Sequence, residues 1–134
     1  IPVDVLGSSS YIGLSHPAKA LLLDIAWQYR GRNNGCLLTS LKFLRLRGWK
    51  SADVVDRAKS QLIESKLIYQ TVQGHRPNKA SWYAITWHAL DANDRYDYGA
   101  AAGFKRGAYR DLKINVLSPS GGTEPVCIVP SAGD

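Results

Sequence analysis

The sequence predicts a single α+β domain, mainly helical, with a C-terminal extension, and three observations lead to that prediction. Apolar residues recur at helical spacing in three segments between residues 15 and 66. Two later segments, residues 67–73 and 81–87, are rich in the aromatic and β-branched residues that favour strands. The chain has 134 residues, which is enough for one well-buried core.

The first helix is expected to begin after Ser15, a residue type that caps helix N-termini well. Ala18, Leu22 and Ile25 then follow at helical spacing, and the Gly- and Asn-rich residues 30–35 end the helix. Residues 1–14 carry a few apolar side chains and a Gly-Ser break. We therefore expect them to form an extended N-terminal extension.

Residues 36–38 are a short apolar run that predicts one small strand. Thr39 is positioned to cap a second helix, which continues to about residue 47 and stops at Gly48. Ser51 is positioned to cap a third helix that continues to about residue 66 and buries an apolar side. Two short helices joined by a Gly-containing turn are typical of a helix-turn-helix.

After the third helix, residues 67–73 alternate apolar and polar side chains, residues 74–79 form a turn, and residues 81–87 form a second strand. This order of helices and strands is that of a winged helix-turn-helix, three helices with a small antiparallel sheet, which we expect over residues 15–90. Residues 91–134 are predicted to be a partly irregular C-terminal extension. Their short apolar runs at 113–117 and 125–129 fit either a hairpin or a flexible tail.

Charge is concentrated in the predicted domain. Residues 15–90 hold 12 Lys and Arg against 4 Asp and Glu, a net charge of +8, although the whole chain carries only +6. The two flanks together therefore carry −2. A basic block between acidic flanks predicts a polyanionic partner for the block.

Several classes of function receive no support. The three histidines and the distant Cys36 and Cys127 do not have the spacing of metal ligands, and the chain contains no nucleophile motif. We expect no catalysis, cofactor or metal, and two free thiols in a protein of the bacterial cytoplasm. No apolar run is long enough for a membrane span, and no secretory leader opens the chain.

The third helix is the predicted reader of base edges, because the second helix of a helix-turn-helix lies in the major groove. Arg57 has the side chain that best grips a guanine. The alternative is that Arg57 pairs with Asp53 one turn earlier and only decorates a solvated face. The predicted contact set at this helix is Lys50, Ser51, Asp53, Arg57 and Ser60.

Phosphate contacts are predicted at two further places. The turn between the strands is expected to touch phosphate or the minor groove through His75, Arg76, Asn78 and Lys79. Arg45 and Arg47 lie near the turn between the helices, where backbone contacts occur. An ordinary exposed hairpin and plain surface arginines are the alternatives. The four tryptophans suit packing in a small core better than stacking on single strands.

Five stretches of the sequence resemble helix-turn-helix proteins encoded by proteobacterial phages and integrated mobile elements. They are SHPAKAL at 15–21, QYRGRNNG at 28–35, RGWKS at 47–51, RPNKA at 76–80 and YAITW at 83–87. The likeness spans about residues 3–91. The apolar residues 36–38 depart from it, since an acidic or polar residue is expected after Gly35. The resemblance implies DNA binding in regulation or replication and brings no catalytic residues.

The sequence thus favours a duplex-DNA-binding protein, a transcription regulator or a factor that recognises a replication origin. Because one half-site is short, a homodimer on a palindrome is expected. The alternative is a winged-helix module that binds a host or partner protein, with the C-terminal extension ordering on that partner. A third, weaker option is RNA or single-strand binding through residues 104–110.

Overall fold

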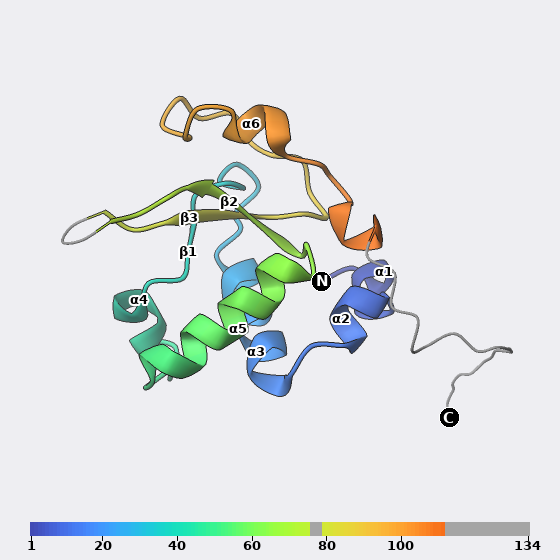
Figure 1. Cartoon of the computed structure of the whole chain (residues 1–134), viewed down its shortest axis with the longest axis vertical. Helices are drawn as coiled ribbons and strands as arrows, with labels where there is room; N and C mark the ends of the chain where they lie inside the picture. The colour runs from blue at the N-terminus through green and yellow to red at the C-terminus, as the bar shows by residue number, and fades with distance from the viewer. Residues whose placement is uncertain (76–78, 112–134) are drawn as a thin grey trace, which may run out of the picture.

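The computed structural model describes residues 1–75 and 79–111 and has an α+β architecture, with six α-helices and a small antiparallel sheet in those ranges. Most helices lie on one side of the sheet, and a later segment that includes the short helix of residues 100–103 lies on the other (Figure 1). The elements, in chain order, are α1 (Val3–Leu6), α2 (Ser9–Ile12), α3 (His16–Trp27), β1 (Leu37–Leu38), α4 (Leu41–Arg45), α5 (Ala52–Glu64), β2 (Ile68–Val72), β3 (Trp82–Ile85), α6 (Ala100–Gly103) and the 3-10 helix η1 (Ala108–Asp111).

Serine hydroxyls set the starts of the three helices that were predicted. The side chains of Ser15, Ser40 and Ser51 each accept a hydrogen bond from the backbone amide three residues later. The prediction that Thr39 caps the second helix is therefore wrong by one residue. Thr39 is buried instead, and its neighbour Ser40 has the extended backbone of an N-cap.

The core lies between α3, α5 and the sheet. The buried residues of α3 are Ala18, Leu21, Leu22 and Ile25, and those of α5 are Val55, Ala58 and Leu62. The helical spacing predicted Ala18, Leu22 and Ile25 on α3, and Val55, Ala58 and Leu62 repeat at the same spacing on α5. Both helices therefore present one apolar side to the core and leave the opposite side in water.

The sheet has the strand order β1-β3-β2, with both pairs antiparallel. Leu37 of β1 pairs with Tyr83 of β3, and Ile68 of β2 pairs with Ile85 of β3. The sheet is also tied to α3, because the side-chain amide of Gln28 donates to the carbonyl oxygen of Leu38 and accepts from its amide, both at 2.8 Å. The short segment before α4 is thus a true strand.

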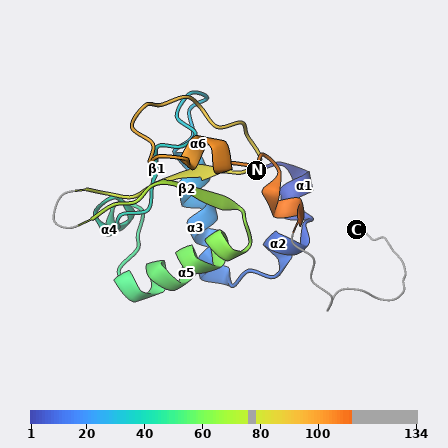
Figure 2. The same cartoon turned by 45° about the horizontal axis from the view of Figure 1, so that its top comes forward.

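The N-terminal segment differs from the sequence prediction. Residues 1–14 were expected to be extended, but Val3–Leu6 and Ser9–Ile12 form two short helices. Val5 is fully buried, and the hydroxyl of buried Ser10 donates to the carbonyl oxygen of Tyr109 at 2.6 Å. These helices form because residues near the other end of the described chain pack against them, as Figure 2 also shows for η1.

Residues 91–111 pack on the sheet and against the N-terminal helices. The hydroxyl of Tyr69 on β2 donates to the carbonyl oxygen of Ala100, and the backbone amide of Gly107 donates to the carbonyl oxygen of Thr86. Tyr109 is only 1% exposed. The predicted hairpin at 113–117 and 125–129 lies outside the described residues.

Candidate nucleic-acid interface

The turn between α4 and α5 is held by two hydrogen bonds from Trp49. Its backbone amide donates to the carbonyl oxygen of Leu44 at 3.1 Å, and its indole Nε1 donates to the carboxylate of Asp24 on α3 at 2.6 Å. Trp49 thereby fixes α4 and the start of α5 relative to α3. Trp49 is partly buried and packs against the core, as the sequence analysis expects of tryptophans in a small domain.

Helix α5 exposes the side that was predicted to meet DNA. Asp53, Arg57 and Ser60 are exposed, and their spacing places them on the side of the helix opposite Val55, Ala58 and Leu62. The helix is 13 residues long, enough to cross a groove. None of these three side chains is covered by another part of the described chain.

Arg57 is not an isolated cation on this surface. Its Nη1 atom lies 3.1 Å from a carboxylate oxygen of Asp53, one helical turn earlier. The two side chains are 69% and 81% exposed, so water screens the pair strongly. The ion pair that the sequence offered as an alternative is therefore formed.

Lys50 and Ser51 stand at the start of α5. Lys50 is exposed, and the Ser51 hydroxyl accepts from the amide of Val54 at 3.3 Å. That bond leaves the hydroxyl proton of Ser51 available as a donor. Ser51 thus caps the helix and keeps a hydrogen-bond donor at its N-terminal end.

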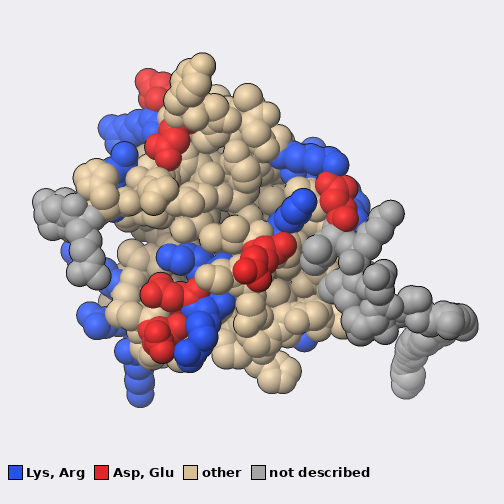
Figure 3. Space-filling view, in the orientation of Figure 1, with Lys and Arg blue, Asp and Glu red and all other residues tan. Residues whose placement is uncertain are grey.

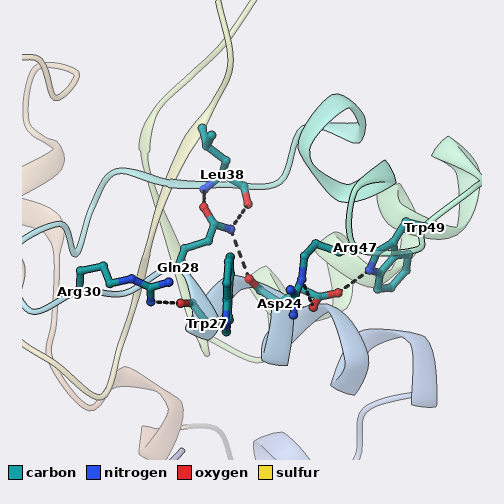
Figure 4. Close-up of polar contacts among 7 residues, drawn as sticks. All are labelled: Asp24, Trp27, Gln28, Arg30, Leu38, Arg47 and Trp49. Carbon is teal, nitrogen blue, oxygen red and sulfur yellow. Dashed lines mark hydrogen bonds and ion pairs between the residues drawn. The ribbon is translucent and has the colours of Figure 1, made fainter.

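The two arginines near the turn have different surroundings. Arg45 is exposed at the end of α4. Arg47 lies against α3, where its Nε donates to Asp24 at 3.1 Å and its guanidinium stacks over the ring of Trp27 at 4.2 Å (Figure 4). The structure therefore brings Arg45 to the predicted interface and engages Arg47 in a contact within the chain.

The β2–β3 loop carries the remaining predicted residues. His75 and Lys79 are exposed and form a narrow pair, in which each backbone amide donates to the carbonyl oxygen of the other, at 2.8 and 3.0 Å. Lys79 therefore stands at the base of a tight loop. Arg76 and Asn78, which were predicted to contact phosphate, lie outside the described residues.

The candidate elements share one side of the molecule. In Figures 1 and 2 the described base of the β2–β3 loop, α4 and the N-terminal end of α5 all lie toward the left of the view. Figure 3 shows acidic and basic side chains alternating over α5 and further basic ones toward α4. Apart from Arg47, which pairs with Asp24, the exposed cations of these elements and of the α4–α5 turn are Lys42, Arg45, Lys50, Arg57 and Lys79. The exposed acids in the first half of α5 are Asp53 and Asp56.

Sequence reasoning missed the residues that hold this surface together. The carboxylate of Asp24 accepts hydrogen bonds from both Arg47 and Trp49. Buried Asn34, between α3 and β1, is hydrogen-bonded to β3 and to residues 88–91. Partners 23 to 57 residues apart leave no local signal in the sequence. Only the packing of α3 against the turn and the sheet brings them together.

The described residues supply no constellation for metal binding, since they contain no group of three or more His, Cys, Asp or Glu side chains suited to an ion. His88 stacks on Tyr29 with ring centres 4.5 Å apart, and its burial holds the pKa of the imidazole below the ordinary value. Its neutral ring is thus part of the packing. None of the described helices combines the length and the hydropathy that a membrane span needs.

In comparisons with protein-family models, with curated proteins and with solved structures, nothing matched this chain. The resemblance drawn from the sequence therefore stays a prediction. The surface formed by α4, α5 and the described base of the β2–β3 loop is the feature of the chain that bears on its function.

Proposed function

We propose that this chain is a winged helix-turn-helix protein that binds duplex DNA and acts as a transcription regulator or origin-recognition factor of a phage or mobile element. The order α3, β1, α4, α5, β2, loop, β3 supports the fold assignment. In this assignment α4 and α5 are the helix-turn-helix, and the β2–β3 loop is the wing.

One observation carries the proposal. The outward side of α5 is exposed over its first half, next to exposed cations from α4, from the turn and from the base of the β2–β3 loop. A groove-reading helix flanked by phosphate-binding cations requires this arrangement. Five exposed cations against two exposed acids give the surface the sign that a phosphate backbone attracts.

Binding would place the start of α5 in the major groove. Arg57 would exchange the Asp53 carboxylate for the O6 and N7 atoms of a guanine, and Asp53 would then accept from a cytosine amino group. Lys50, Arg45 and Lys79 would contact phosphates on either side. Two copies of the chain on a palindromic site, half-sites about one helical turn apart, would double the specific contacts.

The test is fluorescence anisotropy with labelled duplexes over a range of salt concentrations. We expect the affinity for any duplex to fall about 10-fold to 100-fold between 50 and 200 mM salt, as phosphate contacts require. Lys79→Ala should weaken all duplexes alike, while Arg57→Ala should reduce discrimination among duplexes selected from a random pool. Arg106→Ala, which removes an exposed cation between α6 and η1, is the matched control and should leave binding unchanged.

The alternative function, a protein-interaction module, is favoured by the closed Asp53–Arg57 pair and the mixed charge of α5. The same experiment separates the two. DNA binding through this surface is ruled out if the protein shows no affinity for duplex at 50 mM salt. It is also ruled out if Arg106→Ala lowers the affinity as much as Lys79→Ala does.

A further inference from the structure

Helix α3 exposes two large apolar side chains on the side opposite its buried residues. Leu23 is 56% exposed and Trp27 is 50% exposed, and their spacing of four residues places them on successive turns of one side. Leu46, directly after α4, is 85% exposed, and its neighbour Arg47 stacks on Trp27. We use the name α3 patch for these three exposed apolar residues, two on α3 and one next in sequence to the Arg47 that covers a face of Trp27. Large exposed apolar side chains on neighbouring elements mark interaction sites more often than single ones do.

Two arginines hold the Trp27 side chain of the α3 patch in place. The guanidinium carbons of Arg30 and Arg47 lie 4.8 and 4.2 Å from the centre of the Trp27 ring. Arg30 also donates to the backbone carbonyl oxygens of Trp27 and Tyr29, and Arg47 is anchored by Asp24. Binding to such a surface immobilises few side chains, which lowers the entropic cost of association.

The geometry of Trp27 excludes one class of partner. Figure 4 shows its indole edge-on, with one guanidinium toward each face. A nucleobase stacks on an open aromatic face, and here both faces are covered. The ring edge and the two leucines remain, and they suit aliphatic side chains. Tryptophan and arginine are also the residues that dominate protein–protein binding energy.

Charge decides what kind of protein segment fits. Arg30 and Arg47 border the patch, and the carboxylate of Asp24 beside them already accepts from Arg47 and from Trp49. A second copy of the chain, meeting this patch with its own, would bring guanidinium groups together. A shallow depression of about 400 Å³ adjoins the patch and is lined in part by Asp24, Arg47 and Lys50, so its border is also basic.

We propose that the α3 patch binds an acidic, amphipathic segment of a partner protein. Its aliphatic side chains would pack on Leu23, Trp27 and Leu46, and its carboxylates would face Arg30 and Arg47. The patch lies on the outer side of α3, whereas DNA binding is proposed for the outer side of α5. Apart from Lys50, which borders both surfaces, the two functions therefore use different side chains and can be tested apart.

The test is selection of a displayed library of random 16-residue peptides against the full chain. Selected peptides should be enriched in Asp and Glu, with Leu or Ile at helical spacing. Their affinity, measured by anisotropy, should fall about 10-fold or more with the double variant Leu23→Ser, Leu46→Ser. Both substituted side chains are largely exposed, so the fold should persist, as circular dichroism would show.

Ile12→Ser on α2 is the matched control, because Ile12 is 51% exposed and lies outside the patch. It should leave peptide affinity unchanged, and the double variant should leave duplex affinity unchanged. The proposal is overturned if the selection yields no binder, if the selected peptides are not enriched in Asp and Glu, or if they bind the double variant as tightly as the wild type. It is also overturned if sedimentation reveals a dimer that Leu46→Ser dissociates. If the wild-type chain binds the selected peptides but no duplex, only the proposed DNA function is contradicted.

Discussion

The guanidinium of Arg57 and the carboxylate of Asp53 face each other across one turn of α5, 3.1 Å apart. Both side chains are mostly exposed, so the pair contributes less than about 1 kcal/mol to stability in water. It therefore opens at little cost when a stronger partner approaches. A guanine edge, which offers two acceptors to one guanidinium, is such a partner.

The first prediction concerns this pair. Asp53→Asn should raise the affinity for random-sequence duplex about 3-fold to 10-fold at low salt, because it removes an exposed negative charge beside the phosphates. Anisotropy at 50 and 200 mM salt would measure the change. Glu64→Gln, at the C-terminal end of the same helix, is the control and should change affinity less than about 2-fold. Weaker binding of random-sequence duplex by Asp53→Asn would contradict this prediction, because it would show that Asp53 orients Arg57 on every duplex.

The second prediction concerns Asn34, which is fully buried. Its side-chain amide donates to the carbonyl oxygens of Ile85 and Ala89 at 3.0 and 2.9 Å and accepts from the amide of Ile85 at 2.8 Å. Asn34→Ala would leave the two Ile85 backbone groups and Ala89's half-buried carbonyl without these partners, and a buried group left so costs about 1–3 kcal/mol. We expect the free energy of unfolding to fall by about 3–5 kcal/mol in urea denaturation.

The neighbouring Asn33 provides the control for Asn34. Its side chain accepts from the amide of Arg30 and donates to the carbonyl oxygen of Gln28, both within the loop that follows α3. These bonds are local and partly exposed, so water can replace them. Asn33→Ala should lower stability by only about 1 kcal/mol. Equal losses in the two variants would mean that Asn34 does not anchor the sheet.

The third prediction concerns Tyr96 at alkaline pH. Burial, together with the nearby Cys36, raises the pKa of the Tyr96 hydroxyl to about 12. The neutral hydroxyl donates to the carbonyl oxygens of Asn34 and Asp91. A pKa that is higher in the folded state than in the unfolded state gives stability below pH 10 that is lost as the pH rises toward 12.

Thermal unfolding between pH 8 and 12 would test Tyr96. Tyr96→Phe should be less stable than the wild type at pH 8, and the difference should shrink as the pH approaches 12. A difference that stays constant over this range would contradict the assignment of the raised pKa to Tyr96.

The fourth prediction concerns acid. The hydroxyl of Tyr109 and the guanidinium of Arg110 donate to the carboxylate of Asp4 and lower its pKa below the ordinary value. A lowered carboxyl pKa gives stability that is present above the unfolded value, about 3.9, and is lost as the pH falls through the folded value. Asp4→Asn should therefore be less stable than the wild type at pH 6 and equal to it in strong acid.

Tyr109→Phe tests the same contact from the other side. It removes the hydrogen bond that lowers the pKa of Asp4 most. The acid dependence of its stability should lie between those of the wild type and Asp4→Asn. Acid denaturation curves for the three proteins would measure this, and three parallel curves would count against the contact between α1 and η1.

The local elements follow from the sequence because their causes are local. Apolar spacing in α3 and α5 predicted which residues are buried, and the same spacing placed Asp53, Arg57 and Ser60 on the outward side of α5. Caps and glycines predicted the ends of these helices to within a few residues. The strands were likewise visible in residue type, because aromatic and β-branched side chains favour a pleated, half-buried surface.

Tertiary structure alone decided the rest, because contacts between distant segments leave no pattern in the chain. Arg47 turned toward Asp24 and Trp27 rather than toward the outer surface, and residues 1–14 became helical where Tyr109 packs against them. Burial of Asn34 depends on groups that lie 51 to 57 residues later. Such contacts contribute energy only when packing excludes water from both partners. A local stretch of sequence does not show which distant residues will pack together.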